Sequence, residues 1–316
     1  MAKAKKKKSF LSFLTDLFFV IVFLVGVGVL LYPTFSDLWN NYRNSQLITK
    51  YSEVVTQIPE EDYSVILDDA RKYNELHRVN EILDAFDEEA EEYILTHPYD
   101  QLLNPMNNNI MGFIEIPKIS VKLAIYHGVG PDSLENGCGH IEGTSLPVGG
   151  VGNHTVLSAH RGLPTAKLFT DLDQLEEGDV FILNILGEKL AYAVDQIKTV
   201  KPEEIEDLAI DEEKDLATLV TCTPYGVNTH RLLVRGIRTE YTEEIAEQEE
   251  KNNLPSIRNP LEGIEEKQKM LVIGGMAFVA IMLILSIILR ISDRRKAKRR
   301  AMLAREQEER DEQERS

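Results

Sequence analysis

Three side chains in this sequence could together carry out acyl transfer: a cysteine, a histidine and an arginine. Cys222 follows the β-branched, apolar run Thr-Leu-Val-Thr and precedes Thr-Pro-Tyr-Gly, so it lies at the end of a predicted strand. His160 ends a strand-like run, and Arg231 opens the run Arg-Leu-Leu-Val-Arg-Gly. All three groups are therefore expected at strand ends, where a side chain can leave the core and meet a ligand.

These residue types fit a nucleophilic mechanism. A free cysteine is mostly protonated at neutral pH, so a histidine must take the proton of Cys222 or stabilise its thiolate. An arginine stays charged and can stabilise the oxyanion that forms at an attacked carbonyl, a contribution of roughly 3 to 4 kcal/mol for one donor in other enzymes. The alternative for a lone cysteine is a small buried side chain. The pattern favours Cys222 as nucleophile, with His160 and Arg231 as its partners.

Four other histidines are weaker candidates. His230 adjoins Arg231, but neighbouring strand residues point to opposite faces, so His230 turns away from the thiol if Arg231 faces it. The remaining three, His127, His140 and His154, lack the compact spacing of metal ligands. We expect structural roles for them and predict neither a metal nor another cofactor.

The blocks around these residues resemble the sortase family, most closely the class C, pilin-polymerising sortases of Gram-positive bacteria. The resemblance is dense over residues 110–240 and looser in the flanks. It implies an eight-stranded β-barrel in which His160, Cys222 and Arg231 form the catalytic triad. The blocks that carry it begin at Leu157 (Leu-Ser-Ala-His-Arg-Gly-Leu-Pro), Leu219 (Leu-Val-Thr-Cys-Thr-Pro-Tyr-Gly), Gly112 (Gly-Phe-Ile-Glu-Ile-Pro-Lys-Ile), Gly139 (Gly-His-Ile-Glu-Gly-Thr-Ser-Leu-Pro) and Ala166 (Ala-Lys-Leu-Phe-Thr-Asp-Leu-Asp).

The resemblance further implies transpeptidation. Cys222 would cleave an LPXTG-like sorting signal between Thr and Gly, hold the product as a thioacyl intermediate and pass it to a lysine amine of another pilin subunit. The nearest alternative is a cell-wall anchoring sortase that uses a peptidoglycan precursor amine. Others are a papain-like protease, whose cysteine precedes its histidine, an L,D-transpeptidase, whose Ser-x-Gly-Cys block is absent here, and a membrane-tethered binding domain without catalysis.

The residues themselves predict a mainly β fold. Apolar or alternating runs separated by Gly, Pro, Asn and Asp predict strands, and helical spacing predicts two helices before them at 36–57 and 60–95. An acidic helix is expected at 201–214. The pattern does not choose between a barrel and a sandwich. The predicted strands are 111–119, 121–128, 154–160, 179–185, 188–200, 216–223 and 231–238.

Class C sortases carry an N-terminal lid whose Asp-Pro-aromatic motif covers the active site. This sequence has no Asp-Pro-Trp or Asp-Pro-Phe, and the nearest equivalent is His97-Pro98-Tyr99. These three residues are the predicted lid. The alternative is an ordinary surface linker, because Pro and Asn are frequent in this stretch.

Both ends of the chain are typical of a membrane protein. Residues 10–32 and 270–291 are apolar and long enough to cross a bilayer, and basic runs flank them at Lys5–Lys8 and Arg294–Arg300. We expect both termini in the cytoplasm and the catalytic domain outside. The predicted order is a basic tail (1–9), a membrane helix (10–32), a helical region with the possible lid (33–109), the barrel (110–240), an acidic linker (241–269), a membrane helix (270–291) and a charged tail (292–316).

The charge and cysteine content limit the classes of partner that we expect this protein to bind. The formal net charge is −17 although both ends are basic, so the middle of the chain is strongly acidic and a nucleic-acid partner is not expected. The expected partners are LPXTG-bearing pilin or surface proteins, a lysine amine acceptor and the membrane. Only two cysteines are present, Cys138 and Cys222, so a disulfide framework is excluded. A single bridge between them would silence the nucleophile, and we instead expect Cys138 in a tightly packed small-residue site.

Overall fold

The computed structural model describes residues 2–79 and 96–252, together with ten isolated positions from 274 to 310. The chain divides into two compact units, of which one comprises Met1–Leu31 with Ile264–Ser316 and the other Tyr32–Gly263. Every strand among the described residues belongs to the second unit.

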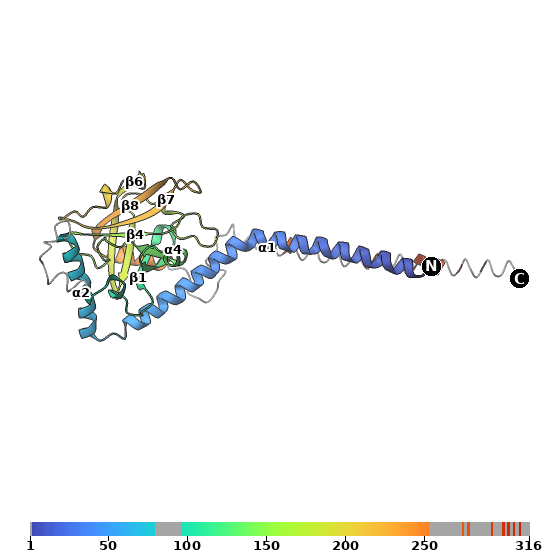
Figure 1. Ribbon diagram of the computed structural model, residues 1–316, viewed down its shortest axis with the longest axis horizontal. Coiled ribbons are helices and arrows are strands. Elements are labelled where there is room, and N and C mark those ends of the chain that lie inside the picture. Colours follow the sequence, from blue (N-terminus) through green and yellow to red (C-terminus); the bar gives the residue numbers. More distant parts are fainter. Residues whose placement is uncertain are drawn as a thin grey trace. The chain divides into compact units, whose positions relative to one another are not determined.

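Eight strands of the described chain close into a barrel in the order β1-β2-β3-β4-β7-β8-β6-β5 (Figure 1). Most neighbours are antiparallel, but β2 with β3 and β4 with β7 are parallel. The predicted barrel is confirmed, and closure leaves no sheet edge unpaired. The strands are β1 (Ile110–Ile116), β2 (Val121–His127), β3 (Cys138–His140), β4 (Asn153–Ser158), β5 (Val180–Ile185), β6 (Glu188–Val200), β7 (Asp215–Thr223) and β8 (His230–Thr239).

Two elements differ from the sequence-based expectation. Strand β3 was not predicted, because three residues are too few to show an alternating pattern. The helix predicted at 201–214 is wrong, since this connection contains only the 3-10 turn η5 (Glu206–Leu208). Its acidic side chains accept hydrogen bonds from nearby backbone N–H groups, as Glu204 does from Lys201 over 2.9 Å, and such local bonds compete with helix formation.

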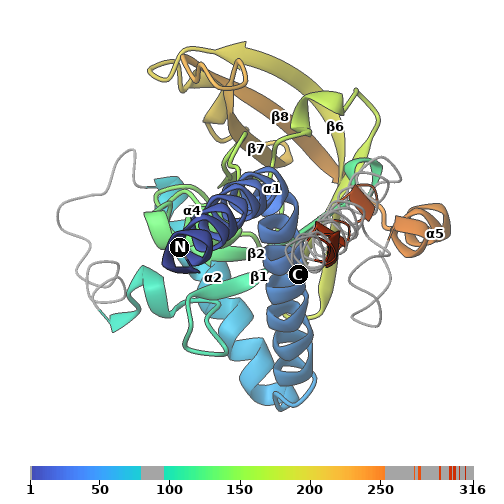
Figure 2. The same cartoon turned by 90° about the vertical axis from the view of Figure 1, so that its right-hand side faces the viewer.

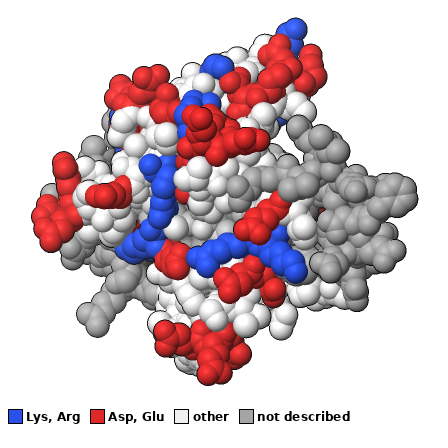
Figure 3. All heavy atoms as spheres, turned by 90° about the vertical axis from the view of Figure 1, so that its left-hand side faces the viewer, with Lys and Arg blue, Asp and Glu red and all other residues white. Residues whose placement is uncertain are grey.

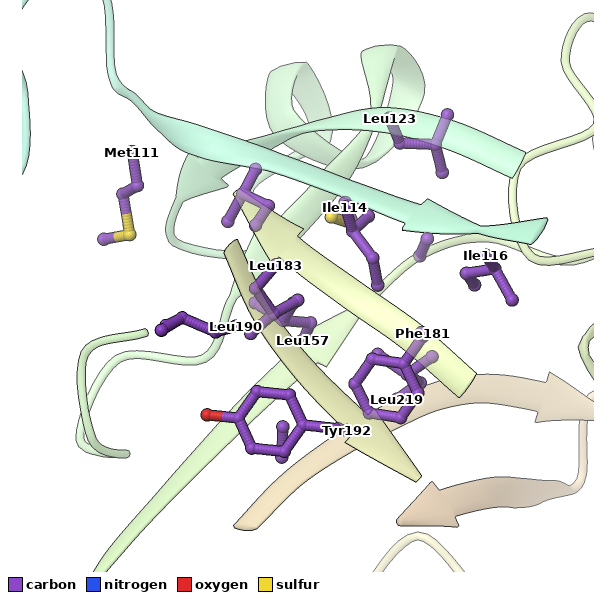
Figure 4. Close-up of a cluster of buried hydrophobic side chains, with 14 of the residues drawn as sticks. Met111, Ile114, Ile116, Leu123, Leu157, Phe181, Leu183, Leu190, Tyr192 and Leu219 are labelled. Carbon is purple, nitrogen blue, oxygen red and sulfur yellow. The ribbon is translucent and has the colours of Figure 1, made fainter. Parts of the chain in front are cut away.

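Alternate residues of the strands fill the barrel. Leu157 of β4 and Leu219 of β7 are fully buried there, and the rings of Phe181 and Tyr192 stack with centroids 5.6 Å apart (Figure 4). Because such a core is close-packed, it provides a rigid support for the strand ends.

Two long helices precede the barrel, α1 (Ala2–Val55) and α2 (Glu60–Val79). The second half of α1 lies along β1 and β2 (Figure 2), where Tyr51 Oη donates to Met111 O over 2.7 Å and accepts from Leu186 N over 2.9 Å. The amide of Asn74 on α2 makes two hydrogen bonds with the Leu146 backbone. Both predicted helices are therefore present, although residues 80–95 of the second lie outside the described residues.

Short helices connect the strands. After the barrel, α5 is tied to β6 through Lys189, which forms an ion pair with Glu249 over 2.7 Å. The short elements are η2 (Tyr99–Gln101), η3 (Pro117–Ile119), α4 (Pro131–Asn136), η4 (Leu172–Gln174) and α5 (Glu243–Asn252).

Within the part of the chain that the structure describes, no helix combines the length and the apolar character needed to cross a membrane. The segment predicted at 270–291 lies outside the described residues except for three positions. The two membrane spans therefore stay predictions.

Candidate active site

Cys222 and Arg231 lie directly opposite each other on neighbouring antiparallel strands. They are partners in the register of β7 and β8, and both are half-buried. Opposite residues of an antiparallel pair have Cβ atoms about 4.5–5.5 Å apart and share one face of the sheet. The guanidinium is held near the turn, because Arg231 Nη1 donates to the carbonyls of His230 over 3.0 Å and Asn228 over 3.3 Å. Regular strand pairing thus brings the arginine to the thiol.

His160 reaches the same level from the other side of β7. Strands β4 and β7 are parallel, and Ser158 at the end of β4 pairs with Val220, so His160 follows two residues beyond this pair, as Cys222 does on β7. The strands stay together beyond this pair, since the Ala159 N–H donates to Val220 O over 3.2 Å. The three predicted catalytic residues are therefore brought to one place by three adjacent strands.

The triad occupies the outer face of the barrel. Side chains alternate along a strand, and the positions two residues before Cys222 and two after Arg231 are Val220 and Leu233. These two belong to a small apolar cluster with Val156, separate from the barrel core, and Ile141 and Leu208 pack against it. The thiol and the guanidinium thus share a face with an apolar cluster.

The segment after His160 is a closed loop, residues 160–170, here named the His160 loop. The Phe169 N–H donates to His160 O over 3.1 Å, and the Gly162 N–H donates to Thr170 Oγ1 over 3.1 Å. Gly162 has φ +77°, and a Cβ there would lie 3.0 Å from the ring of Tyr225. Only glycine suits this backbone conformation and this close approach, so the His160 loop contacts the turn that follows Cys222.

Helix α1 holds the far side of the His160 loop. Asp37 Oδ1 accepts from Lys167 N over 2.7 Å, and Asn40 Nδ2 donates to Thr165 O over 2.7 Å. Burial raises the pKa of the Asp37 carboxyl, and the hydrogen bond from Lys167 opposes that rise. The loop is thereby fixed from two directions, by α1 and by the turn after β7.

His230 is directed away from the thiol, as expected. The register pairs it with Thr223, one position along from Cys222, and successive strand residues face opposite sides. Its Nδ1 lies 2.9 Å from Thr229 Oγ1.

The predicted lid residues lie against β2 and β3. Tyr99 Oη is 2.8 Å from His140 Nδ1, and the Gly128 N–H donates to Tyr99 Oη over 3.1 Å. The Tyr99 ring also meets that of His127 edge-on, with centroids 5.1 Å apart. His97 lies 3.9 Å from Asp69 of α2. The contacts that the structure records for this segment lead to buried histidines and not to Cys222, and a lid role stays a prediction.

His140 and His154 are buried within hydrogen-bond networks. His140 Nε2 is 2.9 Å from Ser145 O, which can only accept, so Nε2 carries the proton and Nδ1 accepts from the tyrosine. Burial lowers the pKa of His140 to about 4. His154 bonds to Ala209 O and Thr218 Oγ1 over 2.8 and 2.7 Å, and burial lowers its pKa too.

Cys138 is not bridged to Cys222, since both are free thiols. Cys138 is fully buried, its Sγ lies 3.5 Å from Ala124 O, and burial raises the pKa of its thiol. The expectation of a tightly packed site is confirmed.

Sequence reasoning missed the residues that support the triad. Arg161, Thr221, Asp37 and Asn40 all hold the strand ends or the His160 loop in place. A sequence signal existed for two of them, since Arg161 lies inside the block that begins at Leu157 and Thr221 inside the block that begins at Leu219. Contacts between α1 and a loop more than 120 residues later leave no local pattern.

Comparisons with known proteins agree with this geometry. A sortase domain model matches residues 114–239. Sortase C from Clostridium perfringens, solved with the C-terminal cell wall sorting motif, is 45% identical with TM-score 0.53, and the match covers 62% of this chain and 99% of that one. Sortase C from Streptococcus pneumoniae, described in terms of catalysis and pilin substrate specificity, is 42% identical with TM-score 0.53, covering 62% and 98%.

Among curated proteins, Sortase D of Bacillus subtilis (strain 168) is 31% identical over 122 residues, which cover 39% of this chain. The chain spans 59% of that curated relative. The chain thus combines a β-barrel that has cysteine, histidine and arginine at adjacent strand ends with matches that cover 98% and 99% of two solved sortase chains. The chain belongs to the sortase family, whose members are cysteine transpeptidases, and class C sortases are among its structural relatives.

Proposed function

We propose that this protein is a class C sortase that cleaves an LPXTG-like sorting signal between Thr and Gly and joins it to a lysine amine of a pilin subunit. The observation that carries the proposal is the pairing of Cys222 with Arg231, with His160 level with the thiol on the other side. Nucleophile, proton carrier and oxyanion donor then converge on one peptide carbonyl.

The chemistry proceeds in two acyl transfers. The Cys222 thiolate attacks the Thr carbonyl, and Arg231 stabilises the resulting oxyanion. Collapse of this intermediate breaks the Thr–Gly bond, His160 gives a proton to the departing glycine amine, and a thioacyl enzyme forms. A neutral lysine amine then attacks the thioester, its surplus proton passes to His160, and the Cys222 thiolate leaves as the new amide forms, which restores the starting thiolate and imidazolium. Water in place of the amine would give hydrolysis.

The side chains next to Cys222 and Arg231 on the same face form a buried apolar cluster that supports the strand ends. Val220 and Leu233 lie two positions from Cys222 and Arg231 on the same face, and Leu208 of η5 packs against them. The C. perfringens sortase C was solved with a sorting motif, which supports the same substrate class here.

Charge favours a protein acceptor. The chain carries a formal net charge of −17. Figure 3 shows one face on which acidic side chains form several groups with lysines and arginines between them. A net acidic protein repels phosphates but attracts an amine-bearing partner, which suits a lysine nucleophile.

We further propose that the enzyme is anchored in the cell membrane by two segments, residues 10–32 and 270–291. The basic runs at Lys5–Lys8 and Arg294–Arg300 would place both termini in the cytoplasm and the catalytic domain outside. Such a location would hold the triad beside secreted pilin chains.

The test uses the full chain in detergent with a labelled LPXTG-like peptide and three acceptors: a peptide with a pilin lysine, a peptidoglycan precursor amine and water. Mass spectrometry of the products identifies the acyl acceptor. Transfer to the lysine peptide supports the proposal, whereas transfer only to the peptidoglycan amine would make the protein an anchoring sortase. Absence of cleavage between Thr and Gly contradicts the proposal.

A further inference from the structure

The two strand ends of the active site are joined by a side-chain hydrogen bond before the catalytic pair. Thr221 Oγ1 donates to Ala159 O over 2.8 Å, and both residues are buried. Each of them immediately precedes a catalytic residue, Cys222 in one strand and His160 in the other.

A second side-chain bond joins the strand ends after the catalytic pair. Arg161 Nη1 donates to Thr223 Oγ1 over 3.2 Å, and these residues immediately follow the catalytic histidine and cysteine. The same guanidinium donates through Nε to Thr170 O over 3.1 Å and forms an ion pair with Asp173 through Nη2. Its side chain is only 9% exposed, whereas that of Asp173 is 49% exposed. The guanidinium therefore links the cysteine strand end, the His160 loop and η4.

We propose that Arg161 is a positioning residue, which together with Thr221 fixes the separation of the Cys222 thiol and the His160 imidazole. The two hydrogen bonds, Thr221 to Ala159 and Arg161 to Thr223, are here named the bracket. This inference rests on the proposed function, because it assigns the bracket to the same catalytic pair. The other contacts recorded between these strand ends in the described part of the chain are backbone bonds and the packing of Tyr225 on Gly162.

Geometry assigns Arg161 to positioning and not to catalysis. It bonds to Thr223, which follows Cys222 on β7, and successive strand residues face opposite sides, so the guanidinium lies on the face away from the thiol. Its donors are already engaged by three acceptors, one of them a carboxylate that compensates its charge. The planar guanidinium can donate to several acceptors at once, and the compact ammonium of a lysine cannot reproduce this arrangement.

The experiment compares Thr223→Val with Thr223→Ser in the full chain. Valine keeps the shape and removes the hydroxyl, whereas serine keeps the hydroxyl. We expect Thr223→Val to lower kcat for peptide transfer about tenfold with KM nearly unchanged, because small displacements of reacting groups are costly. The alkylation rate of Cys222 at a fixed pH, followed by peptide mapping, should also change from that of the wild type. Thr223→Ser should restore both quantities to within about twofold of the wild type.

Arg161→Lys provides a second measurement of the same bond. It should be at least as impaired as Thr223→Val, because a lysine also fails to reproduce the bonds to Thr170 and Asp173. The double variant should be no worse than Arg161→Lys alone, because both variants remove the bond between Arg161 and Thr223. Thr155→Val is the matched control, since it removes a buried threonine bond of 2.9 Å to Ser145 O elsewhere on β4. This control should lower stability without changing kcat.

Two results would overturn the proposal: a wild-type kcat and alkylation rate in both Thr223→Val and Arg161→Lys, or Thr223→Ser as impaired as Thr223→Val. The measurement of the Cys222 alkylation rate needs no peptide substrate. If the wild type fails to process the sorting peptide, the proposed function fails, yet the effect of the bracket on Cys222 is still decided.

Discussion

The molecule contains two cysteine and histidine pairs with opposite properties. Cys138 and His140 lie within β3 and are fully buried, whereas Cys222 and His160 lie at strand ends and are half-buried. Burial raises the pKa of the Cys138 thiol and lowers that of the His140 imidazole to about 4, so both stay neutral. The second pair has an arginine opposite its cysteine. Location within the barrel, and not residue type, separates the structural pair from the reactive one.

The largest contrast is expected between the two cysteines. Cys222→Ala should abolish transfer of the sorting peptide, because no other group can form the thioacyl intermediate. Cys138→Ala should keep transfer near the wild-type rate and lower the free energy of unfolding by about 1 kcal/mol through a small cavity. Peptide transfer and urea denaturation measure the two effects. Residual transfer by Cys222→Ala would show that the reactive pair has been misassigned.

The arginine opposite the thiol should be nearly as sensitive. Arg231→Lys is expected to lower kcat roughly a hundredfold, since a lysine does not reproduce the donor geometry at the oxyanion. Arg235→Lys is the matched control on the same strand, because Arg235 pairs with Asp195 through two bonds of 3.0 and 2.7 Å. Equal losses in the two variants would indicate damage to β8 and not loss of an oxyanion donor. Steady-state kinetics of both variants decides between these readings.

The buried pair should govern stability in acid. The folded pKa of His140, about 4, lies below its unfolded value of 6.5, so the unfolded chain binds a proton between these limits and the native chain does not. Stability should therefore fall by about 3 kcal/mol as pH falls from 6.5 to 4. His140→Gln should flatten this slope, with a residual slope from His127 and His154, whose pKa values burial also lowers. Urea melts at several pH values provide the measurement, and an unchanged slope would contradict the assignment.

The smallest effect is expected at the predicted lid. Tyr99→Phe removes the hydroxyl that bonds to His140 and Gly128, which should lower the free energy of unfolding by about 1 kcal/mol. The alkylation rate of Cys222 should not change, because the recorded hydrogen bonds of the Tyr99 hydroxyl lead to His140 and Gly128 and not to Cys222. Faster alkylation would instead connect this segment to the reactive pair and support its role as a lid.

Sequence analysis could propose the three catalytic candidates because the relevant signals are local. A cysteine between a β-branched run and a proline turn, or an arginine at the start of an apolar run, can be recognised within a few residues. Seven of the eight strands follow from the same alternation, and β3 was missed because it is too short to alternate. The helix predicted at 201–214 failed where local side-chain bonds compete with helical ones.

The sequence by itself thus determined the family and the strands that carry the three predicted catalytic residues, and it predicted Cys222 as the reactive thiol. Only the tertiary structure decided the register that pairs Cys222 with Arg231, the bond from Arg161 to Thr223, and the contacts of α1 with the His160 loop. The physical reason is the separation along the chain over which each kind of interaction acts. Side-chain alternation is set by neighbouring residues, whereas barrel closure and hydrogen bonds across 60 to 130 residues depend on how the whole chain packs.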